Sequence, residues 1–227
     1  LMVCVMLPVV ALAAEKTAST YEELKSAIST ANDGDTIKLL ADIDLSQTIT
    51  VNKTITLNMN GKKLYNTSDL WDKPTAEANN WSLISVRGSG NLTITGNGTF
   101  AAKENDCYAV DVQESATVTI KNGTFIGNIH AVYVFAGTAN VEGGTYSVQQ
   151  KYPDSAKGDE FVLNCYDANR ANGTAHINVT GGTFKNFNPA DNKAEGEGNN
   201  FADNSLVVQK NNTVQNNDYY VGNAANE

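Results

Sequence analysis

Apolar and polar residues alternate in short runs along most of this chain, and one phrase closes four of these runs. Its copies are LTITGNGTF, TVTIKNGTF, ANVEGGTY and HINVTGGTF, which end at Phe100, Phe125, Tyr146 and Phe184. Within a copy the apolar residues stand at every second position, which is the period of a β-strand. In the first copy, Leu92 and Ile94 stand one residue farther from the aromatic than their counterparts do, which predicts a β-bulge.

The ending of the phrase predicts a sharp corner. Asn-Gly-Thr or Gly-Gly-Thr supplies residues that tolerate positive φ, so the chain turns before the aromatic side chain re-enters the interior. Spacings of 25, 21 and 38 residues between the four aromatics show that the unit varies in length while its ending is kept. A second set of apolar runs follows the aromatics and their loops, at residues 82–86, 109–112, 131–135, 161–165 and 205–208.

These units indicate a solenoid. Units of about 20 to 28 residues that cannot bury a face alone must stack on one another. Asn-Gly also favours β-hairpins, but equivalent strands recur one unit apart and not after two-residue loops. We therefore expect parallel stacking, in which each phrase forms one edge of one rung.

A helical pattern precedes the strands. Ser19 to Glu23 offers overlapping capping boxes, and Gly34 is expected at the C′ position that ends the helix. Its apolar face comprises Tyr21, Leu24, Ala27, Ile28 and Ala31. Such a helix would cover the open end of the first rung. Strands are then predicted at residues 36–39, 48–51 and 55–59.

The stretch TYEELKSAISTANDGDTIKL and the Asn/Gly-Gly-Thr-aromatic corners resemble the pectate-lyase-like right-handed parallel β-helix superfamily. The C-terminal part, from GGTFKNFNPADN to NNDYYVG, resembles the closing segment of exported bacterial β-helix proteins of unassigned activity. We therefore expect an all-β fold, a single-stranded right-handed parallel β-helix of about six rungs over residues 35–227. The N-terminal capping helix is expected within residues 15–34.

The first 14 residues, LMVCVMLPVVALAA, are typical of the h-region and cleavage site of a signal peptide. The charged n-region is missing, which predicts that the natural start lies upstream. The run is too short to span a bilayer, so a membrane anchor is only the alternative and no span is expected in the mature chain. We predict a secreted or cell-surface protein. Its net charge of −9 disfavours nucleic acid as a partner.

Two cysteines, Cys107 and Cys165, would remain in the mature chain. The predicted register separates them by two stacked strands, about 9.6 Å. A disulfide tolerates a Cα separation of up to roughly 7 Å. We predict two free, buried thiols.

The resemblance implies a ligand site on the outer face of the strand that follows the variable loop. The predicted outward pairs there are Ser85/Arg87, Asp111/Gln113, Tyr133/Phe135 and Asn164/Tyr166. Aromatic rings on such a face can stack on sugars, while polar neighbours supply directional hydrogen bonds. The predicted ligand-binding residues are Tyr133, Phe135, Tyr166, Asp111, Asn164 and Arg87. Loop residues Trp71, Trp81 and Tyr152 would flank them. The alternative is that the rings stack on one another for stability or are covered by a loop.

A non-catalytic, carbohydrate-binding module is the predicted function. A polysaccharide lyase or glycoside hydrolase acting on an acidic polysaccharide is the alternative, and a structural adhesin or spacer is the second alternative. A glycoside hydrolase needs two carboxylates about 5 to 9.5 Å apart. Asp111 is the only carboxylate in the outward column, although the loop acids Glu104 and Asp106 could supply a partner. The Gly-His-Gly and Arg-x-Pro-x-x-Arg motifs of the family's enzymes are absent from the sequence.

No metal site or cofactor is expected. His130 and His176, the only histidines, fall on different faces in the predicted register, whereas a shared metal needs convergent ligands. Repeated Thr-x-Thr pairs resemble the ice-binding faces of some β-solenoids. The threonine ladder breaks at Asn140 and Asn178, and threonine is favoured on half-exposed strands. We interpret the ladder as structural.

Overall fold

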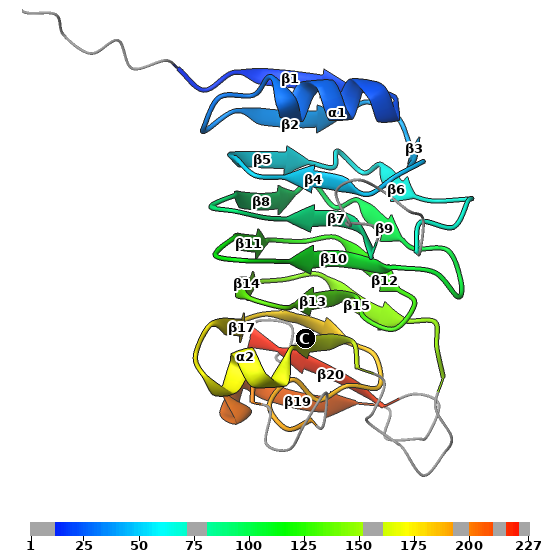
Figure 1. Ribbon diagram of the computed structural model, residues 1–227. Coiled ribbons are helices and arrows are strands. Elements are labelled where there is room, and N and C mark those ends of the chain that lie inside the picture. Colours follow the sequence, from blue (N-terminus) through cyan, green and yellow to red (C-terminus); the bar gives the residue numbers. More distant parts are fainter. Residues whose placement is uncertain (1–11, 72–80, 152–160, 193–199, 211–216, 223–227) are drawn as a thin grey trace, which may run out of the picture.

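The computed structural model describes residues 12–71, 81–151, 161–192, 200–210 and 217–222. It is a right-handed parallel β-helix of about six rungs, with a helix at its N-terminal end and an antiparallel pair of strands at the other (Figure 1). Three sheets form its walls, and the chain visits sheet A, sheet B and sheet C in turn. The predicted fold class is confirmed.

All strand pairings within the sheets are parallel apart from the last two of sheet B. Sheet A contains β1 (Glu15–Ala18), β2 (Thr36–Leu39), β5 (Thr54–Asn58), β8 (Asn91–Thr95), β11 (Thr117–Ile120), β14 (Gly137–Val141) and β17 (Ala175–Val179). Sheet B contains β3 (Ile43–Asp44), β6 (Lys63–Tyr65), β9 (Thr99–Ala101), β12 (Thr124–Gly127), β15 (Thr145–Val148), β18 (Gly182–Phe184), β20 (Asp218–Val221) and β19 (Val207–Lys210). Sheet C contains β4 (Ile49–Val51), β7 (Ser82–Val86), β10 (Tyr108–Val112), β13 (Val132–Val134) and β16 (Leu163–Cys165).

The four phrases stack in register, as predicted. Val118 lies opposite both Leu92 and Ala139 in sheet A. The expected bulge in β8 is wrong, because Ile94 also pairs directly with Ile120. The additional residue lies in the corner after β8, where Asn97 has φ 50°. Asparagine tolerates this left-handed conformation, so the corner takes up the extra residue without disturbing the ladder.

The aromatics that end the phrases form a continuous stack inside the solenoid. Adjacent ring centroids are 4.8, 5.1 and 5.0 Å apart along the series Phe100, Phe125, Tyr146 and Phe184. All four side chains are fully buried. The phenol of Tyr146 donates a hydrogen bond to the carbonyl oxygen of Gly143 at 2.6 Å, which satisfies its only polar group. The remaining interior is filled by the alternating aliphatic residues of the three sheets.

The N-terminal helix α1 (Tyr21–Ser29) covers the first rung. Thr20 is the N-cap, whose hydroxyl oxygen accepts from the backbone N–H of Glu23 at 3.2 Å. The Glu23 carboxylate accepts in turn from the backbone N–H of Ser19 at 2.7 Å. The expected role of Gly34 is wrong: the C-cap is Thr30, and Gly34, at φ 93°, lies in the turn that leads into β2.

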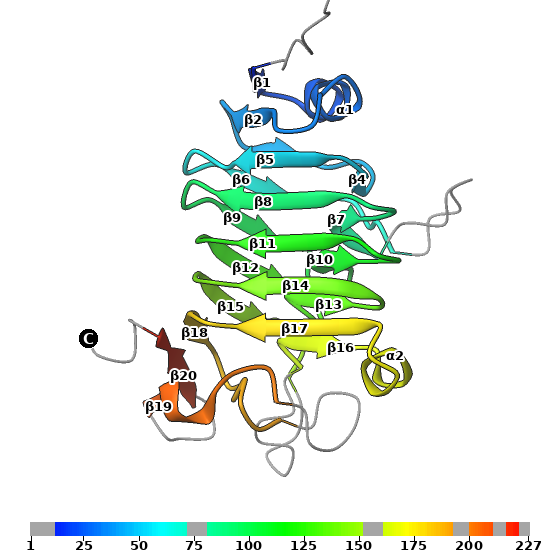
Figure 2. The same ribbon diagram turned by 90° about the vertical axis from the view of Figure 1, so that its left-hand side faces the viewer.

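The C-terminal end departs from the predicted pattern. Residues 205–208 were expected to form a strand of the ligand-bearing sheet, but they belong to the 3-10 helix Asn204–Leu206 and to β19. The Asp203 carboxylate accepts from the backbone N–H of Ser205 at 2.9 Å and caps this turn, so the segment cannot start as an extended strand. β19 pairs antiparallel with β20, which pairs antiparallel with β18 (Figure 2).

Cys107 and Cys165 are both buried, and neither forms a disulfide within the described chain, as predicted. Cys165 lies opposite Val134, which lies opposite Val112, so the thiols are offset along the strands as well as across rungs. Burial raises the pKa of the Cys107 thiol well above its ordinary value.

Residues 1–11 of the predicted signal peptide lie outside the described residues, as does Tyr152. In the described part of the chain, no helix has the length and apolar character needed to cross a membrane.

Candidate functional site

Sheet C, which crosses the front of the molecule in Figure 1, carries the predicted outward columns in register. The middle column contains Ser85, Asp111, Tyr133 and Asn164, one from each of four successive strands. The edge column, beyond the carboxyl ends of the strands, contains Arg87, Gln113, Phe135 and Tyr166. The backbone N–H of each edge residue donates to a carbonyl oxygen of the previous rung at 2.8 or 2.9 Å, so the stacking continues past the strand ends.

The middle column is covered, although three of its residues, Asp111, Tyr133 and Asn164, were predicted to bind ligand. Asp111 is 1% exposed, Asn164 is fully buried and Tyr133 is nearly so. The Asp111 carboxylate accepts from the hydroxyl of Ser85 at 3.0 Å and from Nε2 of Gln113 at 2.8 Å. Burial raises the pKa of Asp111 to about 6, although both hydrogen bonds and the Arg87 charge oppose the rise. The carboxylate is thus shielded from solvent, although it lies on the outer side of sheet C.

His130 and Asn164 form a second buried polar contact in this region. The ring nitrogen Nδ1 of His130 lies 2.7 Å from the carbonyl oxygen of Phe161, so Nδ1 carries the proton and donates it. Its other nitrogen, Nε2, accepts from Nδ2 of Asn164 at 3.2 Å. Burial lowers the pKa of His130 to about 4, which keeps the ring neutral. Within the described chain, Oδ1 of Asn164 has no hydrogen-bond partner.

Two predicted aromatics are exposed on the edge column. Phe135 is 40% exposed and Tyr166 is 38% exposed. Their rings stack with centroids 4.9 Å apart and planes 23° apart. The backbone of Phe135 is anchored, because Nδ2 of Asn169 in α2 (Asp167–Ala171) donates to the carbonyl oxygen of Phe135 at 2.6 Å. The rings thus stack on one another, as the alternative interpretation expected, and the part of the pair that stays exposed forms an apolar patch on neighbouring rungs.

Two arginines on this side of the molecule form ion pairs within the protein. Arg87 forms an ion pair with Glu114 at 3.3 Å, and Arg170 forms one with Asp167 at 2.6 Å. Arg87, predicted to bind ligand, is therefore engaged with a carboxylate at the rim. The two arginines on this side of the described molecule are thus each paired with a carboxylate.

A second aromatic group, which we call the tryptophan cluster, lies at the opposite end of the sheet C strands. It consists of Trp71, Trp81 and Tyr108. Trp71 contacts Trp81 edge-on at 5.0 Å between ring centroids and contacts Tyr108 at 5.5 Å. Trp81 is 47% exposed. Sequence reasoning placed both tryptophans near the site but missed Tyr108, because the predicted strand began one residue after it.

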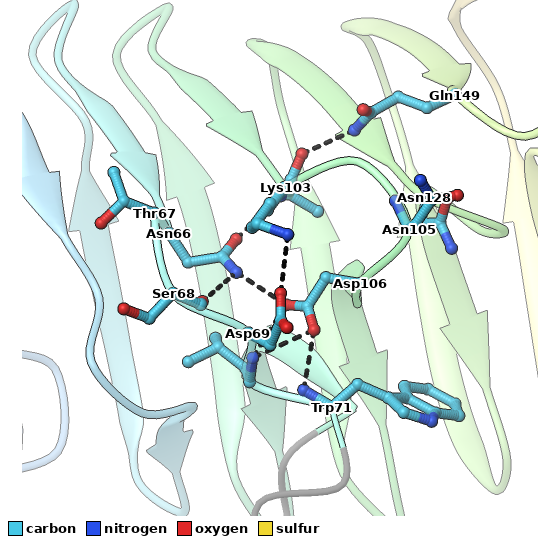
Figure 3. Close-up of polar contacts among 12 residues, drawn as sticks. Asn66, Thr67, Ser68, Asp69, Trp71, Lys103, Asn105, Asp106, Asn128 and Gln149 are labelled. Atoms are coloured by element: carbon cyan, nitrogen blue, oxygen red, sulfur yellow. Dashed lines mark hydrogen bonds and ion pairs between the residues drawn. The ribbon is translucent and has the colours of Figure 1, made fainter.

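The carboxylate of Asp106 fixes the loop that carries Trp71 (Figure 3). This buried carboxylate accepts from the backbone N–H groups of Leu70 and Trp71, at 2.9 to 3.0 Å, and from Nδ2 of Asn66 at 2.6 Å. On the same loop, Asp69 pairs with the ammonium group of Lys103 at 2.7 Å. Both Asp106 oxygens are used in these bonds, so this acid is not free to act as a catalytic partner of Asp111.

A groove of about 830 Å³ runs along the corners between sheets A and B. Its floor consists of stacked glycine corners and its walls carry threonine and asparagine side chains; Leu206 and Val221 close one end. The glycines allow the rungs to stack closely: a Cβ on Gly181 would lie 2.3 Å from the carbonyl oxygen of Glu142. Glu142 itself is paired with Lys121. Backbone packing accounts for this groove.

The described residues contain no group of three or more histidine, cysteine, aspartate or glutamate side chains arranged to hold a metal ion. No protein-family model, curated protein or solved structure matches the sequence. Function is therefore inferred from the fold and from the geometry of sheet C.

Proposed function

We propose that this protein is an exported, non-catalytic binding module that binds carbohydrate through the Phe135–Tyr166 pair. The observation that carries the proposal is the exposed ring stack on neighbouring rungs of sheet C. One face of each ring is covered by the other, and the exposed remainder of the pair can bury the apolar C–H surface of a sugar ring while surrounding polar groups bond its hydroxyls. Exposed apolar patches of this kind on soluble proteins often mark interaction sites.

Membership of the pectate-lyase-like superfamily and an extracellular location belong to the same proposal. The superfamily is supported by the parallel solenoid with an N-terminal helix over its first rung. Export is supported by the apolar N-terminal segment of the sequence. The catalytic alternative, a lyase or hydrolase acting on an acidic polysaccharide, has less support. Asp111 is buried and both oxygens of Asp106 accept hydrogen bonds, so these two acids do not form an exposed carboxylate pair.

The test is a glycan array probed with the wild-type protein, followed by calorimetry on the best ligand. The double variant Phe135→Ala with Tyr166→Ala should lower affinity by about tenfold or more, because each lost ring contact is worth on the order of 1 kcal/mol. Tyr65→Ala is the matched control, since that ring lies on sheet B beneath the ammonium group of Lys63.

Urea unfolding of each variant shows whether the fold is retained. A blank array, or an affinity that the double variant leaves unchanged, would refute the proposed site and favour a structural adhesin or spacer. Release of unsaturated uronides or of reducing sugar from an acidic polysaccharide would instead establish the catalytic alternative.

A further inference from the structure

The two exposed aromatic surfaces of sheet C lie at opposite ends of its strands. Ser82 pairs with Tyr108 and Val112 pairs with Val134. Trp81 therefore occupies the same position along its strand as Cys107 does in the next rung. Phe135 occupies the same position as Gln113, which follows Cys107 by six residues. At about 3.3 Å per residue, the tryptophan cluster and the Phe135–Tyr166 pair are about 20 Å apart along the strands. A ligand that contacts both must extend across the strands' whole length.

Both tryptophans are held in fixed positions. The Asp106 carboxylate binds the backbone N–H of Trp71 at 2.9 Å, and the carbonyl oxygen of Trp81 accepts from the backbone N–H of Tyr108 at 2.7 Å. Asp106 directly precedes Cys107 and β10, so one short segment orders the loop and starts the strand. A buried carboxylate that accepts several backbone N–H groups is a strong and directional anchor.

We propose that Trp71 and Trp81 form a second sugar-contacting subsite, which Asp106 positions, so that the ligand is an extended oligosaccharide that reaches from one exposed aromatic surface to the other, over the covered middle column of sheet C. This inference rests on the proposed function. Asp106 touches no ligand in this arrangement and acts through Trp71. Rings held in place before binding lose little conformational freedom when the ligand arrives, which favours affinity.

The chemistry of the face indicates a neutral oligosaccharide. At one end Arg87 is paired with Glu114, and at the other Lys103 is paired with Asp69. The net charge of −9 adds an unfavourable field for uronic acids. Uncharged chains of hexoses or pentoses offer the ring faces and hydroxyls that these surfaces match.

The positioning role of Asp106 can be measured without any ligand. Trp71 and Trp81 are the only tryptophans of the chain, and their ring centroids are 5.0 Å apart, so they should give an exciton couplet in circular dichroism. Trp81→Phe defines the signal of the uncoupled state. Asp106→Asn, which places an amide N–H₂ against the donors of the loop, and Asp106→Ala should both reduce the couplet towards that signal. Asp69→Asn, which alters the same loop beside Lys103, is the control and should retain it.

The second subsite is tested with cello-, xylo- and manno-oligosaccharides of graded length, and with oligogalacturonides as the acidic series. Wild-type affinity should rise with length until the ligand covers both surfaces. Trp81→Ala should remove that rise, about tenfold for the long ligands, and leave the short ligands unaffected.

Each result decides a separate part of the proposal. An unchanged couplet in both Asp106 variants would refute the positioning role. Long-chain affinity that is the same in Trp81→Ala would refute the second subsite while the Phe135–Tyr166 site stands. Preference for oligogalacturonides would refute the neutral ligand class. Absence of binding to every series would refute the proposed function and the subsite together, and the couplet would still report on Asp106.

Discussion

Replacing Asp111 by asparagine should stabilise the protein at neutral pH and have little effect at pH 4. The Asp111 carboxylate is almost fully buried, and its pKa rises from 3.8 to about 6 because burial penalises the charged form. The folded state therefore holds this proton more tightly than the unfolded state does. Stability is highest while the group is neutral in both states, falls as pH rises through the window from 3.8 to about 6, and stays low above it.

The expected magnitude follows from the size of this shift. One pKa unit corresponds to about 1.4 kcal/mol, so the buried charge costs about 3 kcal/mol at pH 7.5. Asparagine keeps the shape of the side chain, and its Oδ1 can still accept from Gln113. The Ser85 hydroxyl, now facing an amide N–H₂, can rotate to accept a hydrogen bond. Asp111→Asn should thus recover most of that free energy of unfolding.

The assay is urea unfolding of both proteins at a series of pH values from 4 to 7.5. Subtracting the two curves isolates Asp111, because other titrating groups contribute to both. One such group is His130, whose pKa is lowered from 6.5 to about 4, so its stabilisation is lost as pH falls through that range. The exposed Glu104→Gln is the control and should change the free energy of unfolding little at any pH. A difference between Asp111→Asn and wild type that is constant over the range, or a variant less stable at pH 7.5, would refute the reasoning.

Three further predictions concern the solenoid itself. Phe125→Ala, which opens a gap in the internal aromatic stack, should cost about 3 to 5 kcal/mol in urea unfolding; a loss below about 1 kcal/mol would show that the stack collapses around the gap. Gly181→Ala should lower the melting temperature much more than Gly173→Ala, because only the first Cβ meets backbone, at 2.3 Å, while Gly173 has open space at φ 78°. Equal melting temperatures would contradict close corner stacking. Cys107 and Cys165 should resist a thiol reagent in native protein and react once it unfolds; rapid native labelling would contradict their burial.

The repeat made the register of the strands predictable from the sequence. From that register, the positions of most residues of the candidate site could also be predicted. Strand alternation assigns each side chain to the inside or the outside, so Tyr133, Phe135 and Tyr166 were correctly placed on one outer face. Alternation does not tell whether an outward residue is covered. Tyr133 is packed against Tyr108 at 5.2 Å and against His130 at 5.3 Å, contacts between columns that no single strand reveals.

Features outside the repeat were predicted less well. The role of Asp106 depends on hydrogen bonds to Leu70 and Trp71, more than 30 residues earlier in the chain, and a lone loop acid gives no sign of them. Residues 205–208 were predicted to be one more parallel strand, because the pattern Leu-Val-Val does not reveal in which direction a strand runs. Strand polarity is set by pairing with neighbours, and Val207 finds Val221 on an antiparallel partner.

Two of the long connections leave sheet B and enter sheet C. One joins β6, which ends at Tyr65, to β7, which begins at Ser82, and another joins β15, which ends at Val148, to β16, which begins at Leu163. Each connection starts after a strand whose apolar side chains are buried in the solenoid. Residues can therefore be inserted there without shifting any rung against its neighbours. Sequence changes in these connections can thus alter the surface beside sheet C while the scaffold is inherited intact.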